Sequence, residues 1–201
     1  ILIPGSGVDL NFFKNYKINK KSKIVLFASR LLISKGILEF IKSAEALNSL
    51  GYKFLIVGKL DVDNPDCISK KELEKYVKKG IVEYLGEIKN IRDILLKSKI
   101  VVLPSFYGEG LPKVLIESAA CGLPVITTDH PGCRDAIIPG KTGILVPIKN
   151  TRSIIKGIQK LLQSPDIYES MSKEARHLAL KKFNVKDVVK KHLEIYDQLR
   201  N

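Results

Sequence analysis

The chain has 201 residues, 45% hydrophobic and 27% charged, which suits a soluble protein with one sizeable domain or two small ones. It contains no apolar run near the roughly 18 residues of a membrane helix, and its first residues lack the basic start and apolar middle of a secretory signal. The net charge of +13 predicts an anionic partner, but the sequence has no tryptophan and no platform of aromatics alternating with arginine, so we expect no nucleic acid.

Short apolar, β-branched runs alternate with helical patterns along the chain. The predicted strands are residues 23–29, 53–58, 81–86, 99–105, 123–128 and 143–147. The predicted helices are residues 35–50, 69–79, 91–98, a segment that contains Glu117, and then 151–162, 165–182 and 185–199. Apolar strands that are each followed by a helix indicate a parallel sheet covered on both faces. We therefore predict an α/β fold, a Rossmann-like doubly wound parallel sheet of about six strands, with a helical C-terminal tail.

In such sheets ligands bind at the carboxyl ends of the strands, so the residues that follow each strand are the informative ones. Arg30 lies at the end of the first predicted strand, and Lys35 lies where the next helix begins. Two cations beside a helix N-terminus make a good diphosphate site, because backbone N–H groups and the helix dipole add to the side-chain charges. The alternative is that both are solvated surface residues.

The fourth predicted strand is followed by two glutamates, Glu109 among glycines and Glu117 within an apolar helix. Eight helical positions would separate them by about 12 Å, so the pair is spaced to hold two parts of one extended ligand through its hydroxyl groups. The N–H groups of Gly110 and Leu111 lie between the two acids, ready for phosphate. The alternatives are an exposed loop acid at Glu109 and a Glu117 that pairs with Lys113.

Two weaker motifs also follow strands. The sequence from Asp61 to Asp63 is D-x-D, which could hold a metal ion against a diphosphate, but it precedes Asn64-Pro65 and turn formation explains it better. His130 lies at the ligand-binding edge, where a simple loop histidine is the favoured interpretation over a contact to a ligand. We therefore expect no metal site.

The lysines gather near the two ends of the chain. They are Lys14, Lys17, Lys20, Lys21 and Lys23 at the start, and Lys181, Lys182, Lys186, Lys190 and Lys191 at the end. They form either a solvated face or a surface that docks on acidic lipid. The three cysteines show no C-x-x-C spacing, so we expect free thiols in a reducing compartment. The chain does not begin with Met, and we expect it to be a piece of a longer protein.

Several motifs resemble those of one enzyme family, in order and at the proper spacing over nearly the whole chain. "SRLLISKG" (29–36) resembles the donor-phosphate motif of GT-B glycosyltransferases of the family-4 type, and "EGLPKVLIESAACGLPVITT" (109–128) resembles their E-x7-E signature. "PGCRDAIIPGKTGILVP" (131–147) is similar to the segment that follows it, and "GSGVDLNFF" (5–13) to the crossing between the family's two domains. The resemblance is closest to the bacterial capsule and O-antigen branch.

The resemblance implies one half of a GT-B fold, the half that binds the nucleotide sugar. The domain itself would be residues 21–182, preceded by a linker remnant at 1–20 and followed by a crossover helix at 183–201 that packs on the first domain. Arg30 and Lys35 would hold the diphosphate and stabilise the leaving group.

The resemblance also assigns the rest of the donor site. Glu117 would bind the ribose, and the backbone around Glu87 and Ile88 would meet the base. Glu109 would contact the sugar hydroxyls as a catalytic residue beside Arg30 and Lys35. The amides of Gly110 and Leu111 would lie near the sugar and phosphate.

Two positions depart from the family pattern. Ser29 stands where glycine is common, and Asp135 stands where glutamate is common. Both changes are tolerable, although the second leaves the role of its loop undefined.

The implied activity is transfer of a hexose or N-acetylhexosamine from an NDP-sugar, with UDP expected, to a lipid-linked saccharide in surface polysaccharide synthesis. Anomeric configuration would be retained, with no cofactor and no metal. The expected partners are the nucleotide sugar, a missing N-terminal acceptor domain and an acidic membrane surface, which places the protein in the cytoplasm at the inner face of the membrane. This piece alone would be inactive. A non-catalytic module of the same fold, or another enzyme such as an epimerase or a phosphorylase, stays open.

Overall fold

The computed structural model describes residue 5 and residues 7–14, 22–108 and 110–200 of the chain. Six parallel strands form one sheet in the order β3-β2-β1-β4-β5-β6, which confirms the predicted doubly wound α/β fold. The strands are β1 (Ile24–Ala28), β2 (Lys53–Val57), β3 (Glu83–Tyr84), β4 (Ile100–Leu103), β5 (Val125–Thr128) and β6 (Gly143–Val146). The order reverses between β1 and β4, where doubly wound sheets open a ligand crevice.

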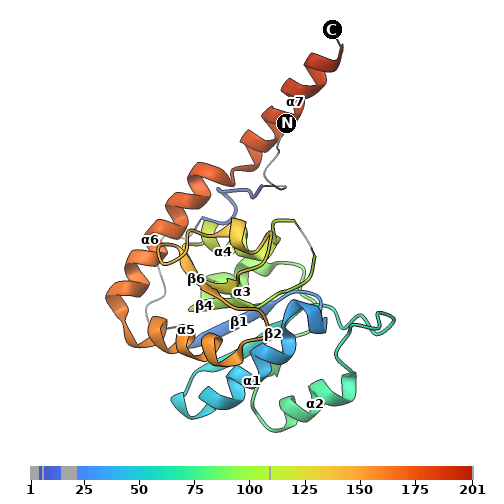
Figure 1. Cartoon of the computed structure of the whole chain (residues 1–201), viewed down its shortest axis with the longest axis vertical. Coiled ribbons are helices and arrows are strands. Elements are labelled where there is room, and N and C mark those ends of the chain that lie inside the picture. The colour runs from blue at the N-terminus through green and yellow to red at the C-terminus, as the bar shows by residue number, and fades with distance from the viewer. Residues whose placement is uncertain (1–4, 6, 15–21, 109, 201) are drawn as a thin grey trace.

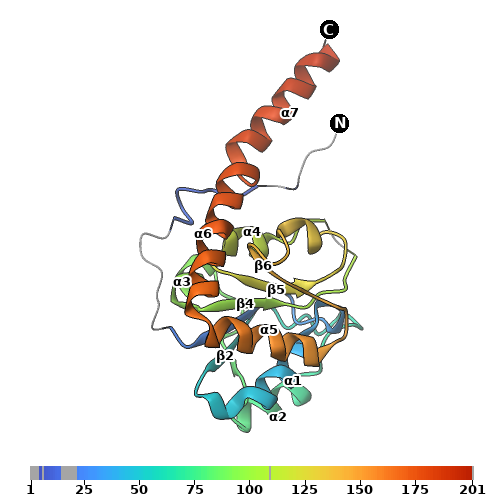
Figure 2. The ribbon, with the colours of Figure 1, turned by 60° about the vertical axis from the view of Figure 1, so that its left-hand side comes forward.

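Helices cover both faces of the sheet (Figures 1 and 2). They are α1 (Ile37–Leu47), α2 (Lys70–Lys78), α3 (Ile91–Lys97), α4 (Lys113–Ala120), α5 (Thr151–Gln163), α6 (Pro165–Lys182) and α7 (Val185–Arg200). Helices α1 and α5 pack side by side on one face, α4 lies on the other, and α6 contacts both α4 and α5. Because both faces are covered, β1, β4 and β5 are buried along nearly their whole length.

The predicted strand at 81–86 is shorter in the structure, where β3 is only Glu83–Tyr84. The N–H of Ile81 donates to the carbonyl of Tyr76 at 3.1 Å, so this residue closes the end of α2 and does not extend the strand. An edge strand pairs on one side only, and a short one is usual there.

The predicted helix at 35–50 is also divided in the structure. Ile33–Lys35 forms a short 3-10 turn, and α1 begins only after Gly36. Gly36 has φ +80°, and a Cβ at this position would lie 2.3 Å from the carbonyl oxygen of Pro104. Only glycine allows the exits of β1 and β4 to approach this closely. The turn that carries Lys35 is thereby fixed against the segment that follows β4.

The N-terminal segment pairs with the junction of α6 and α7. The N–H of Val8 donates to the carbonyl of Phe183 at 2.7 Å, and the N–H of Val185 donates to the carbonyl of Val8 at 3.1 Å. Beyond this junction α7 projects away from the sheet (Figures 1 and 2). Among the residues described, every helix is too short or too polar to cross a lipid bilayer.

Helix α7 leaves apolar side chains in solvent. Val189, Leu193 and Tyr196 are exposed, at spacings that place them on one side of the helix. The expected packing of this helix on another domain stays a prediction, as do the boundaries at 20 and 182. Within the described part of the chain Cys67, Cys121 and Cys133 form no disulfide, and Cys121 and Cys133 are buried.

Candidate functional site

A cleft of about 610 Å³ opens where β1, β2 and β4 end. The last residues of these strands, Ala28, Val57 and Leu103, lie in its wall. Six of the eight residues predicted to bind the donor line this one cleft. They are Arg30, Lys35, Glu87, Ile88, Leu111 and Glu117.

The guanidinium of Arg30 lies at the exit of β1, with its side chain 46% exposed. Its Nη1 is 3.5 Å from a carboxylate oxygen of Asp61, which follows β2. Between them Gly58 has φ +142°, and a Cβ there would lie 1.7 Å from the carbonyl oxygen of Ser29. Only glycine permits this approach, and it brings the loop after β2 to the loop after β1. Asp61 of the D-x-D stretch therefore pairs with the predicted phosphate-binding arginine.

Lys35 is the buried cation of the cleft, with only 7% of its surface exposed. Its Nζ lies 4.4 Å from the centre of the Tyr107 ring, and the Cζ of Arg30 lies 5.7 Å from the same ring. A buried ammonium is costly unless other groups compensate its charge. The groups around Lys35 must therefore stabilise the charged side chain in this position. The cleft thus has a positive wall made of two cations on one aromatic ring.

Glu117 also lines the cleft, from the second turn of α4. It is half-buried, and desolvation raises the pKa of its carboxyl, opposed by the charge of Lys113. The ion pairs among the described residues do not include Glu117, so the pairing with Lys113 considered above amounts to an attraction at longer range. A carboxylate held partly out of water can accept strong hydrogen bonds from ligand hydroxyls.

The segment between the two predicted acids is only partly placed in the cleft. Leu111 lines it, and Pro112 forms the N-cap of α4. Gly110 is exposed and is not among the lining residues. Glu109 lies outside the described residues, so its expected contact with the sugar stays a prediction.

An apolar floor lies beside the charged walls. Glu87 and Ile88 follow β3, and Ile91 begins α3. Gly86, with φ +72°, turns the chain from β3 toward this floor. An apolar surface flanked by backbone groups can accommodate a nucleobase.

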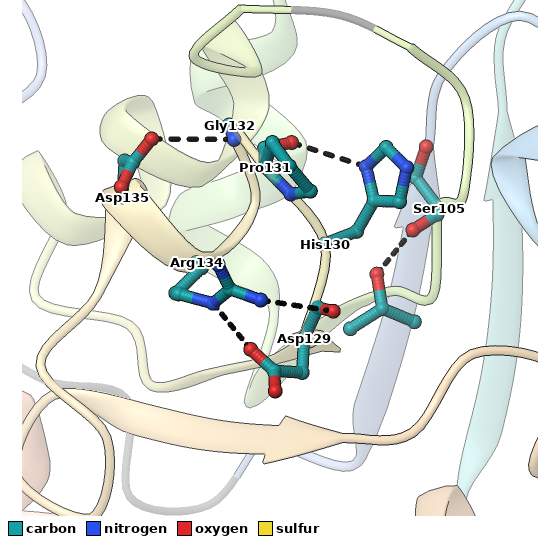
Figure 3. A network of polar contacts seen from close by, with 8 residues as sticks. Ser105, Asp129, His130, Pro131, Gly132, Arg134 and Asp135 are labelled. Carbon is teal, nitrogen blue, oxygen red and sulfur yellow. Dashed lines mark hydrogen bonds and ion pairs between the residues drawn. The ribbon is translucent and has the colours of Figure 1, made fainter.

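The loop after β5 is held by its own polar contacts (Figure 3). The side chain of Arg134 pairs with Asp129, and the N–H of Gly132 donates to the Asp135 carboxylate at 3.3 Å. Asp135 therefore shapes this loop by accepting a backbone hydrogen bond. Aspartate and glutamate can both fill this role, because both carry a carboxylate. His130 is half-buried, with Nδ1 3.1 Å from the Pro131 carbonyl oxygen, and it is not among the residues that line the cleft.

Sequence reasoning missed Tyr107 and the pairing of Asp61 with Arg30. Tyr107 lies in an irregular loop, where no periodicity marks a functional side chain. Asp61 could be noticed in the D-x-D stretch, but its partner depends on how two separate loops meet. The described residues contain no cluster of three or more potential metal ligands.

Comparison with known proteins finds a family match and relatives that are named as glycosyltransferases. Residues 9–178 match the family described as Glycosyl transferases group 1. The chain is 34% identical over 188 residues to the N,N'-diacetylbacillosaminyl-diphospho-undecaprenol alpha-1,3-N-acetylgalactosaminyltransferase of Campylobacter jejuni, covering 94% of this chain and 48% of that protein. It is 27% identical over 173 residues to the capsular polysaccharide biosynthesis glycosyltransferase CapM of Staphylococcus aureus, covering 85% of this chain and 45% of that protein. The chain spans about half the length of the curated relatives it matches.

Solved structures share the fold. Sucrose-phosphate synthase from Thermosynechococcus elongatus superposes with a TM-score of 0.85 at 26% identity, over 99% of this chain and 52% of that one. Anabaena HepE, solved in complex with UDP, gives a TM-score of 0.84 at 21% identity, over 96% of this chain and 56% of that one. The match over residues 9–178 shows that the chain belongs to the glycosyl transferases group 1 family, in agreement with the resemblance read from its motifs.

Proposed function

We propose that this chain binds a nucleoside-diphosphate sugar in the cleft and holds it for glycosyl transfer. The observation that carries the proposal is that Arg30, Lys35 and Glu117, which come from separate elements, line the same cleft. The two cations bind the diphosphate, and Glu117 accepts hydrogen bonds from the ribose hydroxyls. The apolar floor at Ile88 receives the base. Glu109 contacts the sugar in this proposal, on the strength of its place in the E-x7-E signature.

The two cations also supply the chemistry. When the bond between sugar and phosphate breaks, negative charge grows on the departing diphosphate. Arg30 and Lys35 stabilise this charge more in the transition state than in the ground state, which is how fixed charges accelerate a reaction. We propose that they take the place of a metal ion and that the transfer retains anomeric configuration.

The acceptor in this proposal is a lipid-linked saccharide at an acidic membrane surface. The Campylobacter relative is named for a diphospho-undecaprenol acceptor, and CapM for capsular polysaccharide synthesis. The exposed lysines of α6 and α7 suit a surface that docks on acidic lipid. Because the chain spans about half of these relatives, we propose that a further domain reads the acceptor and that this chain alone binds the donor without turnover.

The test is calorimetric titration of the chain with UDP, GDP and ADP. We expect saturable heat with one of the three, and UDP is the first to try because a protein of this fold has been solved with it. A chain that binds none of them would contradict the proposal. Screening the full-length protein against nucleotide sugars, with hydrolysis as the readout, would then identify the sugar.

A further inference from the structure

Tyr107 is not among the residues that line the cleft, but its ring contacts both of the cations that do, Arg30 and Lys35. The ring centre is 4.4 Å from the Lys35 ammonium nitrogen and 5.7 Å from the Arg30 guanidinium carbon. These two cations come from the exit of β1, whereas Tyr107 comes from the exit of β4. The contact therefore joins the two strands at which the sheet order reverses.

The loop that carries the ring is fixed at its base. The N–H of Tyr107 donates to the hydroxyl of Ser105 at 3.2 Å, and the N–H of Phe106 donates to the carbonyl of Ser34 at 2.8 Å. Ser34 precedes Lys35 directly, so one backbone hydrogen bond ties the turn that carries the ammonium to the loop that carries the ring. The position of the ring over the cations thus follows from the backbone.

The chemistry of the ring suits a site for an anion. Two like charges in one cleft repel each other, and a group that stabilises both must attract cations. The Asp61 carboxylate already attracts the Arg30 guanidinium at 3.5 Å, and a further carboxylate beside the cations would also repel a diphosphate. The face of an aromatic ring attracts a cation through its quadrupole and carries no net charge, so it stabilises the pair without cancelling it.

We propose that Tyr107 is a positioning residue for the diphosphate-binding cations: its ring face helps to set the places of Lys35 and Arg30 and adds no negative charge to the site. The inference rests on the proposed function, since it concerns the same diphosphate. The active part of the side chain is the ring face, and the phenol hydroxyl is dispensable.

The test compares Tyr107→Phe, which keeps the ring, with Tyr107→Leu, which keeps an apolar side chain without the quadrupole. We expect Tyr107→Phe to bind UDP within about twofold of the unaltered chain, and Tyr107→Leu to bind about five- to thirtyfold more weakly by calorimetry. UMP binding should fall much less than UDP binding in Tyr107→Leu, because UMP lacks one phosphate of the diphosphate group that the two cations are proposed to bind. Tyr76→Leu is the matched control, since Lys75 lies 6.0 Å over the Tyr76 ring on α2, away from the cleft.

A double-mutant cycle adds a second readout. In a Lys35→Met background, Tyr107→Leu should have a smaller effect on UDP binding than in the unaltered chain, since one of the two cations is absent.

The outcomes separate the inference from the proposed function. If the unaltered chain binds UDP and Tyr107→Leu binds it equally well, or if UMP binding falls as far as UDP binding, the inference is wrong and the proposed function stands. An equal loss in Tyr107→Phe would assign the effect to the hydroxyl, and an undiminished effect in the Lys35→Met background would deny the coupling; either result overturns the inference. If the unaltered chain binds no nucleoside diphosphate, the proposed function and the inference fail together.

Discussion

At the scale of single residues, Arg30 and Lys35 differ in how much water they reach. The side chain of Arg30 is 46% exposed and pairs with Asp61, whereas Lys35 is 7% exposed. Charges interact more strongly where water is excluded, because the local dielectric constant is lower. The buried lysine should therefore contribute more to the binding of a diphosphate than the exposed arginine does.

Alanine substitutions measure this difference. We expect Lys35→Ala to weaken UDP binding by about 1.5–3 kcal/mol, the range for a charge-assisted contact, and Arg30→Ala to have the smaller effect of the two. Calorimetric titration checks both values. Lys160→Ala is the control, since Lys160 is exposed on α5 outside the cleft. Equal binding by all three variants and the unaltered chain would show that neither cation meets the ligand.

The charged carboxyl of Glu117 should lower the stability of the fold while it supports ligand binding. The size of the stability loss depends on pH. Burial raises the pKa of Glu117 above the ordinary value of a glutamate carboxyl, so the charged form is disfavoured in the folded protein. The carboxyl costs no stability below about pH 4.5, and stability is lost as the pH rises through the folded-state pKa. Glu117→Gln removes that loss, so its Tm should exceed that of the unaltered chain by about 1–3 °C at neutral pH.

The same substitution should weaken UDP binding, because an amide oxygen is a poorer acceptor for the ribose hydroxyls than a carboxylate is. Thermal unfolding at pH 7 and at pH 4, with and without UDP, measures both effects. The difference in Tm should vanish at the lower pH. A variant that is less stable than the unaltered chain at neutral pH would show that the carboxylate is stabilised in the fold.

Single residues were predictable where strand exits and motif spacing marked them. Arg30, Lys35 and Glu117 could be chosen because each follows a strand or lies in a recognisable spacing, and they share one cleft. Tyr107 could not be chosen, because its role depends on contacts to two cations that lie more than seventy residues earlier in the chain. Gly110 was chosen from its glycine-rich context, yet it faces solvent outside the lining of the cleft.

At the scale of elements, Gly36 lies between the turn that carries Lys35 and α1. Substitution of this glycine tests whether its close approach to Pro104 shapes the site. Gly36→Ala would place a methyl group 2.3 Å from the Pro104 carbonyl oxygen, at a φ of +80°. Gly51→Ala is a matched control, with φ +69° and open space around the added methyl group. The control carries only the cost of the left-handed conformation, about 1 kcal/mol, whereas Gly36→Ala should lose at least twice that.

Urea denaturation gives the two free energies of unfolding. Their difference isolates the close approach between the exits of β1 and β4. Equal losses in the two variants would mean that the backbone at Gly36 can move away from Pro104 without cost.

Elements were predicted well where hydrophobic runs are long, and less well where backbone geometry decides. The strands around Val25, Val101 and Ile126 read as continuous apolar runs because both faces of the sheet are covered. The sequence shows no comparable pattern for the break in the predicted helix at Gly36. A glycine near the start of a helix is compatible with a continuous helix and with a helix that begins after it. The cause of the break is the neighbouring strand exit, which is distant in the sequence.

At the scale of the whole molecule, the net charge is +13, and many of the lysines lie near the C-terminal end of the chain. Lys186 and Lys191 are exposed on α7, which projects from the sheet. Polybasic surfaces bind acidic lipid through long-range attraction that salt screens. We expect the chain to float with vesicles that contain phosphatidylglycerol, to remain unbound with phosphatidylcholine alone, and to be released by about 1 M salt.

The location of the basic surface can be tested with two double variants that have the same net charge. Replacing Lys186 and Lys191 with glutamate should abolish flotation, whereas the same change at Lys156 and Lys160 on α5 should leave most of it. Equal losses would mean that total charge governs the binding, with no particular docking surface. Unaltered flotation in both variants would exclude electrostatic docking by α7.

The hydrogen bond from the N–H of Phe106 to the carbonyl of Ser34 has a consequence for the proposed binding of a nucleotide sugar. It links the turn after β1 to the loop after β4. A shift of either segment would therefore strain the hydrogen bond to the other. A sugar that draws the β4 loop inward would also draw the ammonium of the next residue toward the phosphates. Sugar and nucleotide should then be sensed cooperatively, with the intact donor held more tightly than the separate affinities of its two halves would suggest.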